Sequence, residues 1–460
     1  MTTQGMTSRK IAHVLLMKVF KQKQTLEQAM NSEAKALNAL SVPDRGFVFH
    51  LAMSVLRHRG ACDVLLAKYL QQPIKDSRLD ITLCLYLGIC QLLVLKSPAH
   101  AAVDTSVELA KSCHPALSGL VNAVLKKIAR EGTFEGLLPS ANTPEWMWEE
   151  WVEVYGEATA QAIATAHLGE PPLDITVKDS TQIAHWKEAL GAELLPTGSL
   201  RLRDAHDVTT LAGFDEGAWW VQELAASLPV KMMGDLRGKK VLDLCAAPGG
   251  KTMQLIAAGA EVTAVDISAK RLERLQENLT RMGMKADLIA ADIHKWQPAD
   301  LREPMRSISG FTEQGEAAKT VGFGEDSPTN NKFDMILLDA PCSATGTMRR
   351  HPEIMVLRTL QDKARLVQIQ HQMLCNALSW LSPEGVLIYA VCSLQQEEGE
   401  DQINALLAEG NAKLIPLTEQ DVVGMSEWLT PQGMLRTLPS HLADQGGMDG
   451  FFLARIAKIQ

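Results

Sequence analysis

The stretch Val241-Leu-Asp-Leu-Cys-Ala-Ala-Pro-Gly-Gly-Lys-Thr252 decides the fold. It opens as a hydrophobic strand and runs into the pair Gly249-Gly250, which allows a tight turn into a helix. Such a turn brings backbone N–H groups to the C-terminal edge of a parallel sheet, where open α/β sheets bind ligands. The stretch therefore predicts an α/β domain with a ligand site at residues 245–251.

The residues that follow repeat this strand–helix pattern. Strands are predicted at residues 240–244, 261–267, 287–291, 333–338 and 385–391, and helices at 251–258, 268–282 and 361–381. Alternating β and α units of this length indicate a parallel, doubly wound sheet. Residues 302–331, between the third and fourth strands, are rich in Gly, Ser, Glu and Thr and predict a long surface loop.

Three ligands compete for the turn after the first strand. A dinucleotide is disfavoured because the pattern G-x-G-x-x-G is absent. A nucleoside triphosphate fits better, because residues 245–252 match the phosphate-loop pattern G-x-x-x-x-G-K-[ST] except for the first glycine. Asp339 also ends a hydrophobic strand, like the acidic residue that holds magnesium in phosphate-loop proteins. However, Pro248 has no N–H to donate to a phosphate, and Cys245 carries a Cβ where the phosphate loop needs glycine. These two mismatches disfavour a nucleoside triphosphate as the ligand.

The third ligand, S-adenosylmethionine, is favoured by the acidic residues at the strand ends. We expect Asp266 to accept the ribose hydroxyls, Asp292 to bind the adenine, and Asp339 to lie beside the amino acid moiety and the substrate. With Asp243, these carboxylates suit a cationic sulfonium ligand and would repel phosphate. Each acid alone is weak evidence, because Asp also caps many βα turns. The four together favour S-adenosylmethionine.

The rest of the chain divides into two further parts. Residues 8–132 carry apolar positions at three- and four-residue spacing, which predicts an all-α domain. One acidic helix is predicted over residues 144–167, and the short apolar alternations after it predict a small α+β region. The predicted domains are therefore residues 1–140, 141–235 and 236–460.

Charge supports the same division. The chain of 460 residues has a formal net charge of −9, which as an average speaks against a nucleic-acid partner. The charge is unevenly placed, because residues 1–140 hold 17 Lys and Arg against 10 Asp and Glu, whereas residues 141–235 hold 5 against 16. If the protein binds RNA, we expect the contact in the basic helical domain. Charge alone does not decide whether the protein binds RNA.

The composition, 46% hydrophobic and 22% charged, is that of a soluble globular protein. The longest apolar run, residues 81–95, is too short to span a bilayer, and the opening residues form no signal-peptide core. We therefore expect a cytoplasmic protein without a membrane partner. The eight cysteines show no C-x-x-C, which predicts neither a disulfide framework nor a bound metal. The oligomeric state stays open, with a monomer as the simpler expectation.

Two cysteines at strand ends suggest a chemical role. Cys342 follows Asp339 closely and Cys392 ends the fifth strand, so adjacent fourth and fifth strands would bring both thiols to the cofactor edge. A thiolate that adds to C6 of a pyrimidine makes C5 nucleophilic toward a sulfonium methyl group. An acid at N3 assists this addition, and a base must then remove the C5 proton. Two cysteines and Asp339 fit these steps.

Several motifs resemble those of the RNA cytosine-5 methyltransferases. They are Leu244-Cys-Ala-Ala-Pro-Gly-Gly-Lys-Thr252, Asp339-Ala-Pro-Cys-Ser343, Gly346-Thr-Met-Arg-Arg-His-Pro-Glu353, Val391-Cys-Ser393 and Asp449-Gly-Phe-Phe-Leu-Ala454. Residues 8–132 resemble the NusB-type RNA-binding domain that is fused to the bacterial ribosomal RNA branch of that family. This likeness rests on Arg57, Gln91, Pro98-Ala-His-Ala-Ala-Val103 and Gly119-Leu-Val-Asn-Ala-Val-Leu125.

The resemblance implies a Rossmann-like class I methyltransferase that methylates C5 of a specific cytosine in 16S ribosomal RNA. It implies that Cys392 is the C6 nucleophile and that Cys342 assists its release. The cofactor-binding residues that it implies are Cys245, Ala246, Ala247, Pro248, Gly249, Gly250, Lys251, Asp266, Asp292 and Asp339. A non-enzymatic alternative is an RNA-binding ribosome assembly factor with a vestigial methyltransferase fold. The presence of both cysteines and all the acids argues against that alternative.

Three features differ from the usual family pattern. Val391 stands where the family usually has Thr, and Gln396-Glu-Glu-Gly399 stands where Pro-Glu-Glu-Asn is common. The loop at residues 302–331 is longer than usual. None of these differences removes a reacting group, so we expect an active enzyme.

Overall fold

The computed structural model describes residues 3–203, 207–298, 332–422 and 424–459. The chain forms two compact units. The first comprises Met1–Pro171, Ser343–Lys363 and Leu438–Met448, and the second comprises Pro172–Cys342, Ala364–Thr437 and Asp449–Gln460. The loop predicted at residues 302–331 lies outside the described residues.

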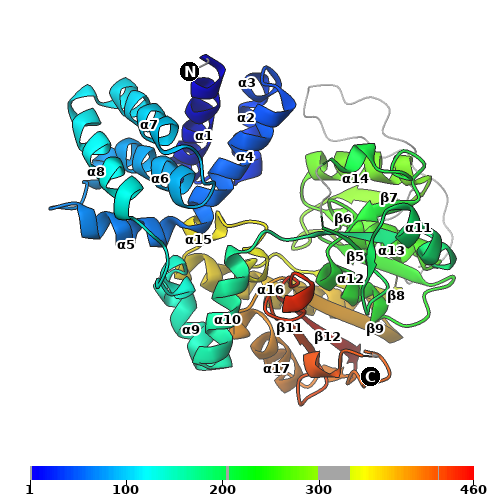
Figure 1. The fold of residues 1–460 in the computed structure, drawn as a ribbon. Helices are drawn as coiled ribbons and strands as arrows, with labels where there is room; N and C mark the ends of the chain where they lie inside the picture. Colours follow the sequence, from blue (N-terminus) through cyan, green and yellow to red (C-terminus); the bar gives the residue numbers. More distant parts are fainter. Residues whose placement is uncertain (1–2, 204–206, 299–331, 423, 460) are drawn as a thin grey trace. The chain divides into compact units, whose positions relative to one another are not determined.

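The first unit is built of helices, as the spacing of its apolar residues predicts (Figure 1). Fully buried side chains such as Leu15, Leu51, Ile89 and Leu125 form its core. Its α-helices are α1 (Thr3–Gln22), α2 (Leu26–Ser32), α3 (Ala34–Asn38), α4 (Val42–Arg57), α5 (Arg59–Tyr69), α6 (Leu79–Leu93), α7 (Ala99–Cys113), α8 (Ser118–Glu131), α9 (Glu145–Tyr155), α10 (Glu157–Leu168) and α15 (Ile354–Leu357). Among the described residues, no helix is both long and apolar enough to cross a membrane.

The prediction of one helix over residues 144–167 is wrong. The chain forms two helices there, α9 and α10, which are separated by Gly156. Gly156 has φ 77° and ψ 157°, a backbone conformation in which a helix cannot continue and which residues other than glycine rarely adopt. The apolar spacing continues through the break, so the pattern alone did not reveal it.

The segment Ser343–Lys363, from late in the chain, packs within the helical unit. The backbone N–H of Leu26 donates to Glu353 Oε1 at 3.3 Å, and Arg57 Nη2 donates to the carbonyl of Arg349 at 2.9 Å. The motif that ends at Glu353 is therefore tied to the helices of the first unit.

The second unit begins with a small antiparallel sheet, which confirms the predicted α+β region. Its strand order is β2 (Glu193–Leu194), β3 (Leu200–Leu202), β1 (Leu173–Val177) and β4 (Trp219–Val221), and helix α11 (Ile183–Ala189) follows β1. Asp174 and Arg201 form a fully buried ion pair between β1 and β3, with Oδ1 and Nε 2.7 Å apart. Leu224 N also donates to Asp174 Oδ2, so the buried carboxylate is paired on both oxygens.

The large sheet of the second unit confirms the predicted doubly wound fold. Within the described residues its strand order is β10-β12-β9-β8-β5-β6-β7, with β11 paired to β12. The parallel strands are β5 (Lys240–Leu244), β6 (Glu261–Asp266), β7 (Asp287–Ala290), β8 (Phe333–Asp339) and β9 (Leu381–Val391). The helices of this region are α12 (Leu224–Lys231), α13 (Gly250–Ala257), α14 (Ala269–Met282), α16 (Leu360–Trp380) and α17 (Glu400–Ala408). Because the order reverses at β5, the C-terminal ends of β5 and β8 flank the crevice where such sheets bind ligands.

Beyond β9 the sheet continues in a way that the sequence analysis did not predict. Strands β10 (Ala412–Leu414), β11 (Leu435–Thr437) and β12 (Phe451–Lys458) are antiparallel to their neighbours. Phe452 is paired with Val391, so the Asp449-to-Ala454 motif lies beside the strand that leads to Cys392. The large sheet is therefore mixed, with its parallel part at the predicted ligand edge.

Candidate active site

The loop after β5 is shaped by two residues with positive φ. Cys245 has φ 63° and Gly249 has φ 108°. A Cβ added at Gly249 would lie 2.1 Å from Leu275 Cδ1 on α14, so this position needs glycine for both shape and space. The predicted residues Ala246, Ala247, Pro248, Gly250 and Lys251 complete the loop, and the last two begin α13.

Asp266, the last residue of β6, fastens this loop. Its Oδ2 accepts from the N–H of Ala247 at 3.2 Å and lies 3.0 Å from Arg271 Nη1, and its Oδ1 accepts from the N–H of Ser268 at 2.9 Å. The residue is 1% exposed. The carboxylate thus holds the loop conformation, and its contact with a ribose stays a prediction.

Asp292 lies in the turn after β7. Its Oδ1 accepts from the N–H of His294 at 3.0 Å, and Lys295 Nζ lies 3.9 Å from its Oδ2. The N–H of Ala291 donates to the carbonyl of Asp266 at 3.1 Å, which brings this turn to the end of β6. The structure therefore brings two of the predicted acids to neighbouring strand ends.

Asp339 and Lys251 form an ion pair at the crevice, with Oδ2 and Nζ 2.8 Å apart. Burial alone would lower the pKa of Lys251, but the charge and hydrogen bond of Asp339 outweigh burial and raise it. Lys251 Nζ also lies 5.1 Å from the centre of the Phe451 ring on β12. Lys251 is therefore held as an ammonium ion beside the predicted acid.

Asp243, the fourth acid of the sequence argument, does not face the crevice. It is fully buried, and its Oδ2 accepts from Thr252 Oγ1 at 2.6 Å. Burial raises its pKa to about 7, against the hydrogen bond from Thr252, which acts to lower it. Asp243 links β5 to the first turn of α13 and contributes structure beneath the loop.

The structure brings the two cysteines together. Cys342 Sγ lies 3.5 Å from Cys392 Sγ, and Cys342 is buried while Cys392 is half-buried. Strands β8 and β9 are parallel neighbours with Asp339 opposite Ala390, and the N–H of Ala340 donates to the carbonyl of Ala390 at 2.9 Å. Cys342 and Cys392 thus follow the C-terminal ends of two paired strands. Asp339, which pairs with Lys251, is the last residue of one of these strands.

Two polar residues behind the thiols were missed by the sequence analysis. Glu398 and Gln370 are both fully buried, and hydrogen bonds connect them to the residues next to Cys342 and Cys392. For Glu398, the sequence signal is the motif Gln396-Glu-Glu-Gly399, which shows a difference from the family pattern but does not show that Glu398 pairs with Gln370. Gln370 lies within an amphipathic helix and gave no signal at all.

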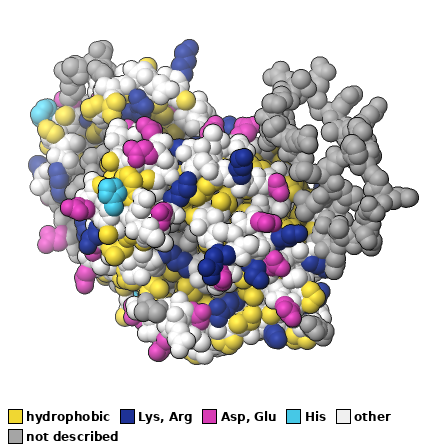
Figure 2. All heavy atoms as spheres, turned by 90° about the vertical axis from the view of Figure 1, so that its right-hand side faces the viewer, with side chains coloured by type: hydrophobic (Ala, Val, Ile, Leu, Met, Phe, Trp, Pro, Cys, Tyr) yellow, Lys and Arg dark blue, Asp and Glu magenta, His cyan; other side chains and the backbone are white. Residues whose placement is uncertain are grey.

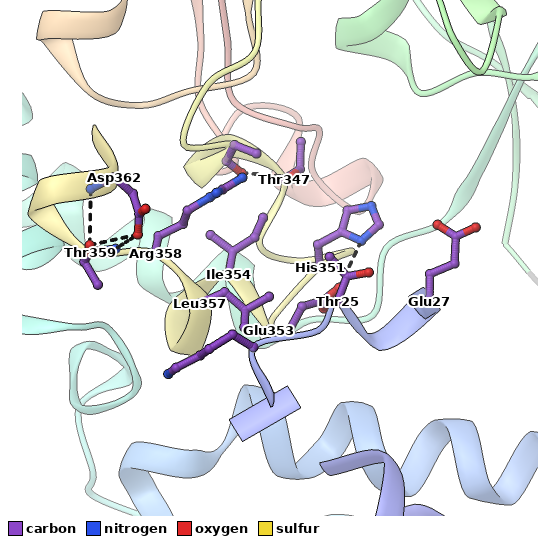
Figure 3. Close-up of a pocket in the computed structure, with 12 residues that line it drawn as sticks. Thr25, Glu27, Thr347, His351, Glu353, Ile354, Leu357, Arg358, Thr359 and Asp362 are labelled. Carbon is purple, nitrogen blue, oxygen red and sulfur yellow. Dashed lines mark hydrogen bonds and ion pairs between the residues drawn. The ribbon is translucent and has the colours of Figure 1, made fainter. Parts of the chain in front are cut away.

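A cavity of about 620 Å³ lies within the first unit, between the α1–α2 connection and residues 344–362 (Figure 3). His351 and Glu353 of the predicted motif line it, with His351 Nδ1 3.7 Å from Glu353 Oε1. Its charged residues are mixed in sign, because Lys23 and Arg358 are accompanied by Glu27, Glu353 and Asp362. None of the predicted cofactor-binding residues or cysteines lines this cavity.

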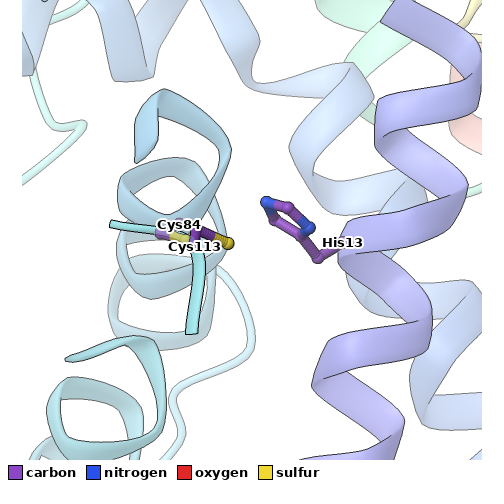
Figure 4. A group of neighbouring side chains, drawn as sticks. All are labelled: His13, Cys84 and Cys113. Atoms are coloured by element: carbon purple, nitrogen blue, oxygen red, sulfur yellow. The ribbon is translucent and has the colours of Figure 1, made fainter. Parts of the chain in front are cut away.

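Two side-chain clusters among the described residues have the composition of metal ligands, although the sequence analysis predicts no metal. In one, His13, Cys84 and Cys113 come together from α1, α6 and α7 (Figure 4). Burial raises the pKa of the Cys84 thiol, which opposes the deprotonation that metal binding requires. His13 Nε2 is also hydrogen-bonded to the carbonyl of Asp80 at 2.9 Å, so core packing explains this cluster. The other cluster, His371, Cys375 and Glu409, contains a half-exposed ion pair of 2.8 Å between His371 and Glu409.

Figure 2 shows one face of the molecule, on which Lys and Arg side chains are interspersed with Asp and Glu. No single basic field covers that face among the described residues. Surface charge therefore gives no direct sign of an RNA-binding area on that face.

Comparisons with known proteins agree with these features. Residues 233–457 match the family model "16S rRNA methyltransferase RsmB/F", and residues 6–130 match the NusB family model. The chain is 34% identical to the ribosomal RNA small subunit methyltransferase B of Pseudomonas syringae, covering 92% of this chain and 91% of that protein. It is also 34% identical to the protein of the same name from Pseudomonas putida, covering 94% of each.

Among solved structures, the crystal structure of PH0851 has the same fold. It covers 100% of both chains with a TM-score of 0.74 at 21% sequence identity. The matches to both domains and to full-length relatives agree with the resemblance that the sequence motifs predict. The chain therefore belongs to the RsmB/F family of 16S rRNA methyltransferases and carries a NusB-family domain, which makes it an S-adenosylmethionine-dependent RNA methyltransferase.

Proposed function

We propose that this protein transfers a methyl group to C5 of one cytosine in 16S ribosomal RNA, through a covalent bond between Cys392 and C6. The observation that carries the proposal is the pair of thiols 3.5 Å apart at the ligand edge of the sheet. Two adjacent pyrimidine carbons react in this chemistry, so two neighbouring thiols can act on one base.

The residues at this edge fit S-adenosylmethionine, which when bound supplies the methyl group as part of a cationic sulfonium. Residues 245–251 would hold it through the backbone of their left-handed turn, where Gly249 leaves no room for a side chain. Asp292 and Asp339 add negative charge on either side, which favours a cation over a phosphate. We assign Asp266 the same role, in addition to its hold on the Ala247 N–H.

The thiolate of Cys392 would attack C6 of the cytosine and form a carbon–sulfur bond. Addition at C6 pushes electrons toward N3, and Asp339 with Lys251 would supply the proton or hydrogen bond that N3 then needs. The 2.8 Å contact between these two side chains is a charge-assisted hydrogen bond from the Lys251 ammonium ion to Asp339 Oδ2, so the ammonium ion stands beside the acid that would face N3. C5 becomes nucleophilic and takes the methyl group.

The second half of the reaction needs a base near C5. Cys342 would take the C5 proton, after which the bond between C6 and Cys392 breaks and the pyrimidine becomes aromatic again. Because a stacked base hides C5 and C6, the target cytosine has to be unstacked or single-stranded. We assign the recognition of the surrounding RNA to the NusB-family domain, where the Lys and Arg excess lies.

The test is to incubate the protein with small-subunit RNA and S-adenosylmethionine labelled in its methyl group, and then to digest the RNA to nucleosides. The expected product is labelled 5-methylcytidine, in an amount that approaches one labelled methyl group for each RNA molecule. Label on another nucleoside would overturn the proposed reaction. RNA binding without any transfer would favour the alternative of an assembly factor with a vestigial fold.

A further inference from the structure

A chain of buried hydrogen bonds connects the two thiol-bearing loops. Ser393, which follows Cys392, donates from Oγ to Glu398 Oε2 at 2.5 Å. Gln370 Nε2 donates to Glu398 Oε1 at 3.0 Å and to the carbonyl of Pro341 at 2.9 Å. Because Pro341 precedes Cys342, the side chains of Glu398 and Gln370 join the backbone beside one thiol to the backbone beside the other. We refer to these two side chains as the Glu398–Gln370 bridge.

The bridge is fully shielded from solvent. Ser393, Glu398 and Gln370 are all 0% exposed. A buried carboxylate is costly unless its oxygens are paired, and apolar residues of similar volume often give equal or better stability. We therefore infer that these buried polar side chains position the two thiol-bearing loops rather than add to the stability of the fold.

The neighbours of the bridge fix its position. Tyr389 Oη donates to the backbone carbonyl of Glu398 at 2.7 Å, and the N–H of Gln395 donates to Ser393 Oγ at 3.0 Å. Since Ser393 Oγ accepts one hydrogen bond, its own proton is directed at Glu398. The hydroxyl and the carboxylate are thus held from both sides.

The variant residue Gly399 is explained by the same region. Arg436 donates to the carbonyl of Ser393 and pairs with Glu400. A Cβ added at Gly399 would lie 2.4 Å from Arg436 Nη2 and 3.0 Å from the Phe452 ring. Glycine therefore gives Arg436 the space to reach the backbone that follows Cys392.

We propose that Glu398 and Gln370 are positioning residues that set the separation of the Cys342 and Cys392 thiols. This inference rests on the proposed function, in which one thiol acts at C6 and the other at C5. Neither side chain would touch the base, because both are buried behind the loops. Their effect is to keep both sulfur atoms within reach of adjacent carbons, since errors of about 1 Å are enough to slow an enzyme on the order of a hundredfold.

The main variant is Gln370→Leu. It replaces Gln370 by an apolar side chain of similar size and so removes both of the hydrogen bonds that Gln370 donates. Its matched control is Gln402→Leu. Gln402 is 3% exposed and donates from Nε2 to the carbonyl of Val367 at 2.7 Å, so it joins α17 to α16. The bridge instead joins α16 to the turn Gln396–Glu398, and the Gln402 hydrogen bond reaches neither thiol loop. We expect Gln370→Leu to lower kcat for methyl transfer on the order of tenfold to a hundredfold, with KM for both substrates little changed. Gln402→Leu should change kcat by less than about threefold.

A second measurement needs no methyl transfer. In a glutathione redox buffer, the Cys342 and Cys392 thiols exchange with glutathione disulfide to give a protein disulfide and two molecules of reduced glutathione. The equilibrium constant, read by mass spectrometry of alkylated peptides, reports how well the two thiols are held together. We expect Gln370→Leu to lower this constant on the order of tenfold and Gln402→Leu to leave it unchanged.

The outcomes separate the two proposals. If Cys392→Ala transfers methyl groups at the rate of the unsubstituted protein, the proposed function fails, and the thiol equilibrium still tests the bridge. If Gln370→Leu and Gln402→Leu give the same kcat and the same thiol equilibrium, the bridge is merely structural and the inference fails. Should Gln370→Leu not fold, Ser393→Ala removes one hydroxyl of the same chain, and an unchanged thiol equilibrium in that variant would overturn the inference.

Discussion

Cys342 Sγ lies 3.5 Å from Cys392 Sγ, although the two residues are 50 positions apart in the sequence. The pairing of Asp339 with Ala390 across β8 and β9 produces this proximity, because each cysteine follows its paired residue by a few positions. In the proposed reaction, Cys392 bonds to C6 and Cys342 acts at C5 of the same base, so both thiols have to lie close to it. Because the two roles differ, we expect different results from substituting each cysteine.

Cys392→Ala is expected to abolish methyl transfer, because no bond to C6 can form and C5 stays unreactive. Cys342→Ala is expected to leave the first bond intact but to slow its breakage. An RNA–protein adduct should then survive denaturation and migrate as a shifted band on a denaturing gel. The double variant should give no adduct. An adduct from Cys392→Ala would show that the nucleophile is assigned to the wrong cysteine.

Lys251→Met is expected to lower kcat on the order of a hundredfold, because Asp339 loses the ammonium ion 2.8 Å away. The matched control is Lys240→Met, at the exposed start of the same strand–loop–helix unit. Initial rates at saturating RNA and S-adenosylmethionine measure the effect. A reduction of equal size in both variants would mean that the Lys251–Asp339 pair has no particular part in the reaction.

Gly249→Ala is expected to weaken S-adenosylmethionine binding by more than about tenfold, because its Cβ would collide with Leu275 and shift the loop. Gly238→Ala is the control, since Gly238 also has positive φ, 67°, but a Cβ there meets nothing within 4 Å. The control should lose about 1 kcal/mol of stability and no affinity. Isothermal titration of each variant with the cofactor compares the two. Equal affinity in both would mean that the loop does not hold the cofactor.

Stability is expected to depend on pH through Asp243. Its pKa is about 7 in the folded protein and 3.8 when exposed, so the folded state keeps a proton that the unfolded chain has released. Stability from this group therefore falls as pH rises from about 4 to about 7, by up to about 4 kcal/mol. Asp243→Asn removes the titration, and the melting temperature of the variant should rise relative to the unsubstituted protein as the pH increases. A difference that does not vary with pH would contradict the burial of a titrating carboxyl group.

The strand ends of the site could be predicted from the sequence, while the groups behind them could not. Asp266, Asp339 and Cys392 each follow a run of apolar residues, and parallel strands necessarily bring such ends to one edge. Gln370 lies on α16 and Glu398 in the short turn Gln396–Glu398 before α17, and no local pattern encodes the hydrogen bond that joins them. Gly156 broke a predicted helix for a similar reason, since its left-handed φ is set by the turn and not by the apolar spacing.

The basic residues of α8 provide the last prediction, which concerns RNA. Lys126, Lys127 and Arg130 are exposed on one helix, whereas Lys18, also basic and in the same domain, is already paired with Glu33. Replacing the three α8 residues with Gln is expected to weaken binding to small-subunit RNA, because fewer phosphates are neutralised and fewer counterions released. The slope of log affinity against log salt should fall by about 2, at roughly 0.7 for each lost phosphate contact.

Lys111→Gln is the control for these α8 variants, because Lys111 is exposed on α7 of the same domain and is paired with Glu108. Its substitution should leave the salt slope nearly unchanged, well short of the roughly 0.7 expected for one lost phosphate contact. Filter binding over a range of salt concentrations measures both slopes. If the triple variant keeps the unsubstituted affinity and slope, the positive charge of α8 does not face RNA phosphate, and the NusB-family domain has to recognise RNA through another surface.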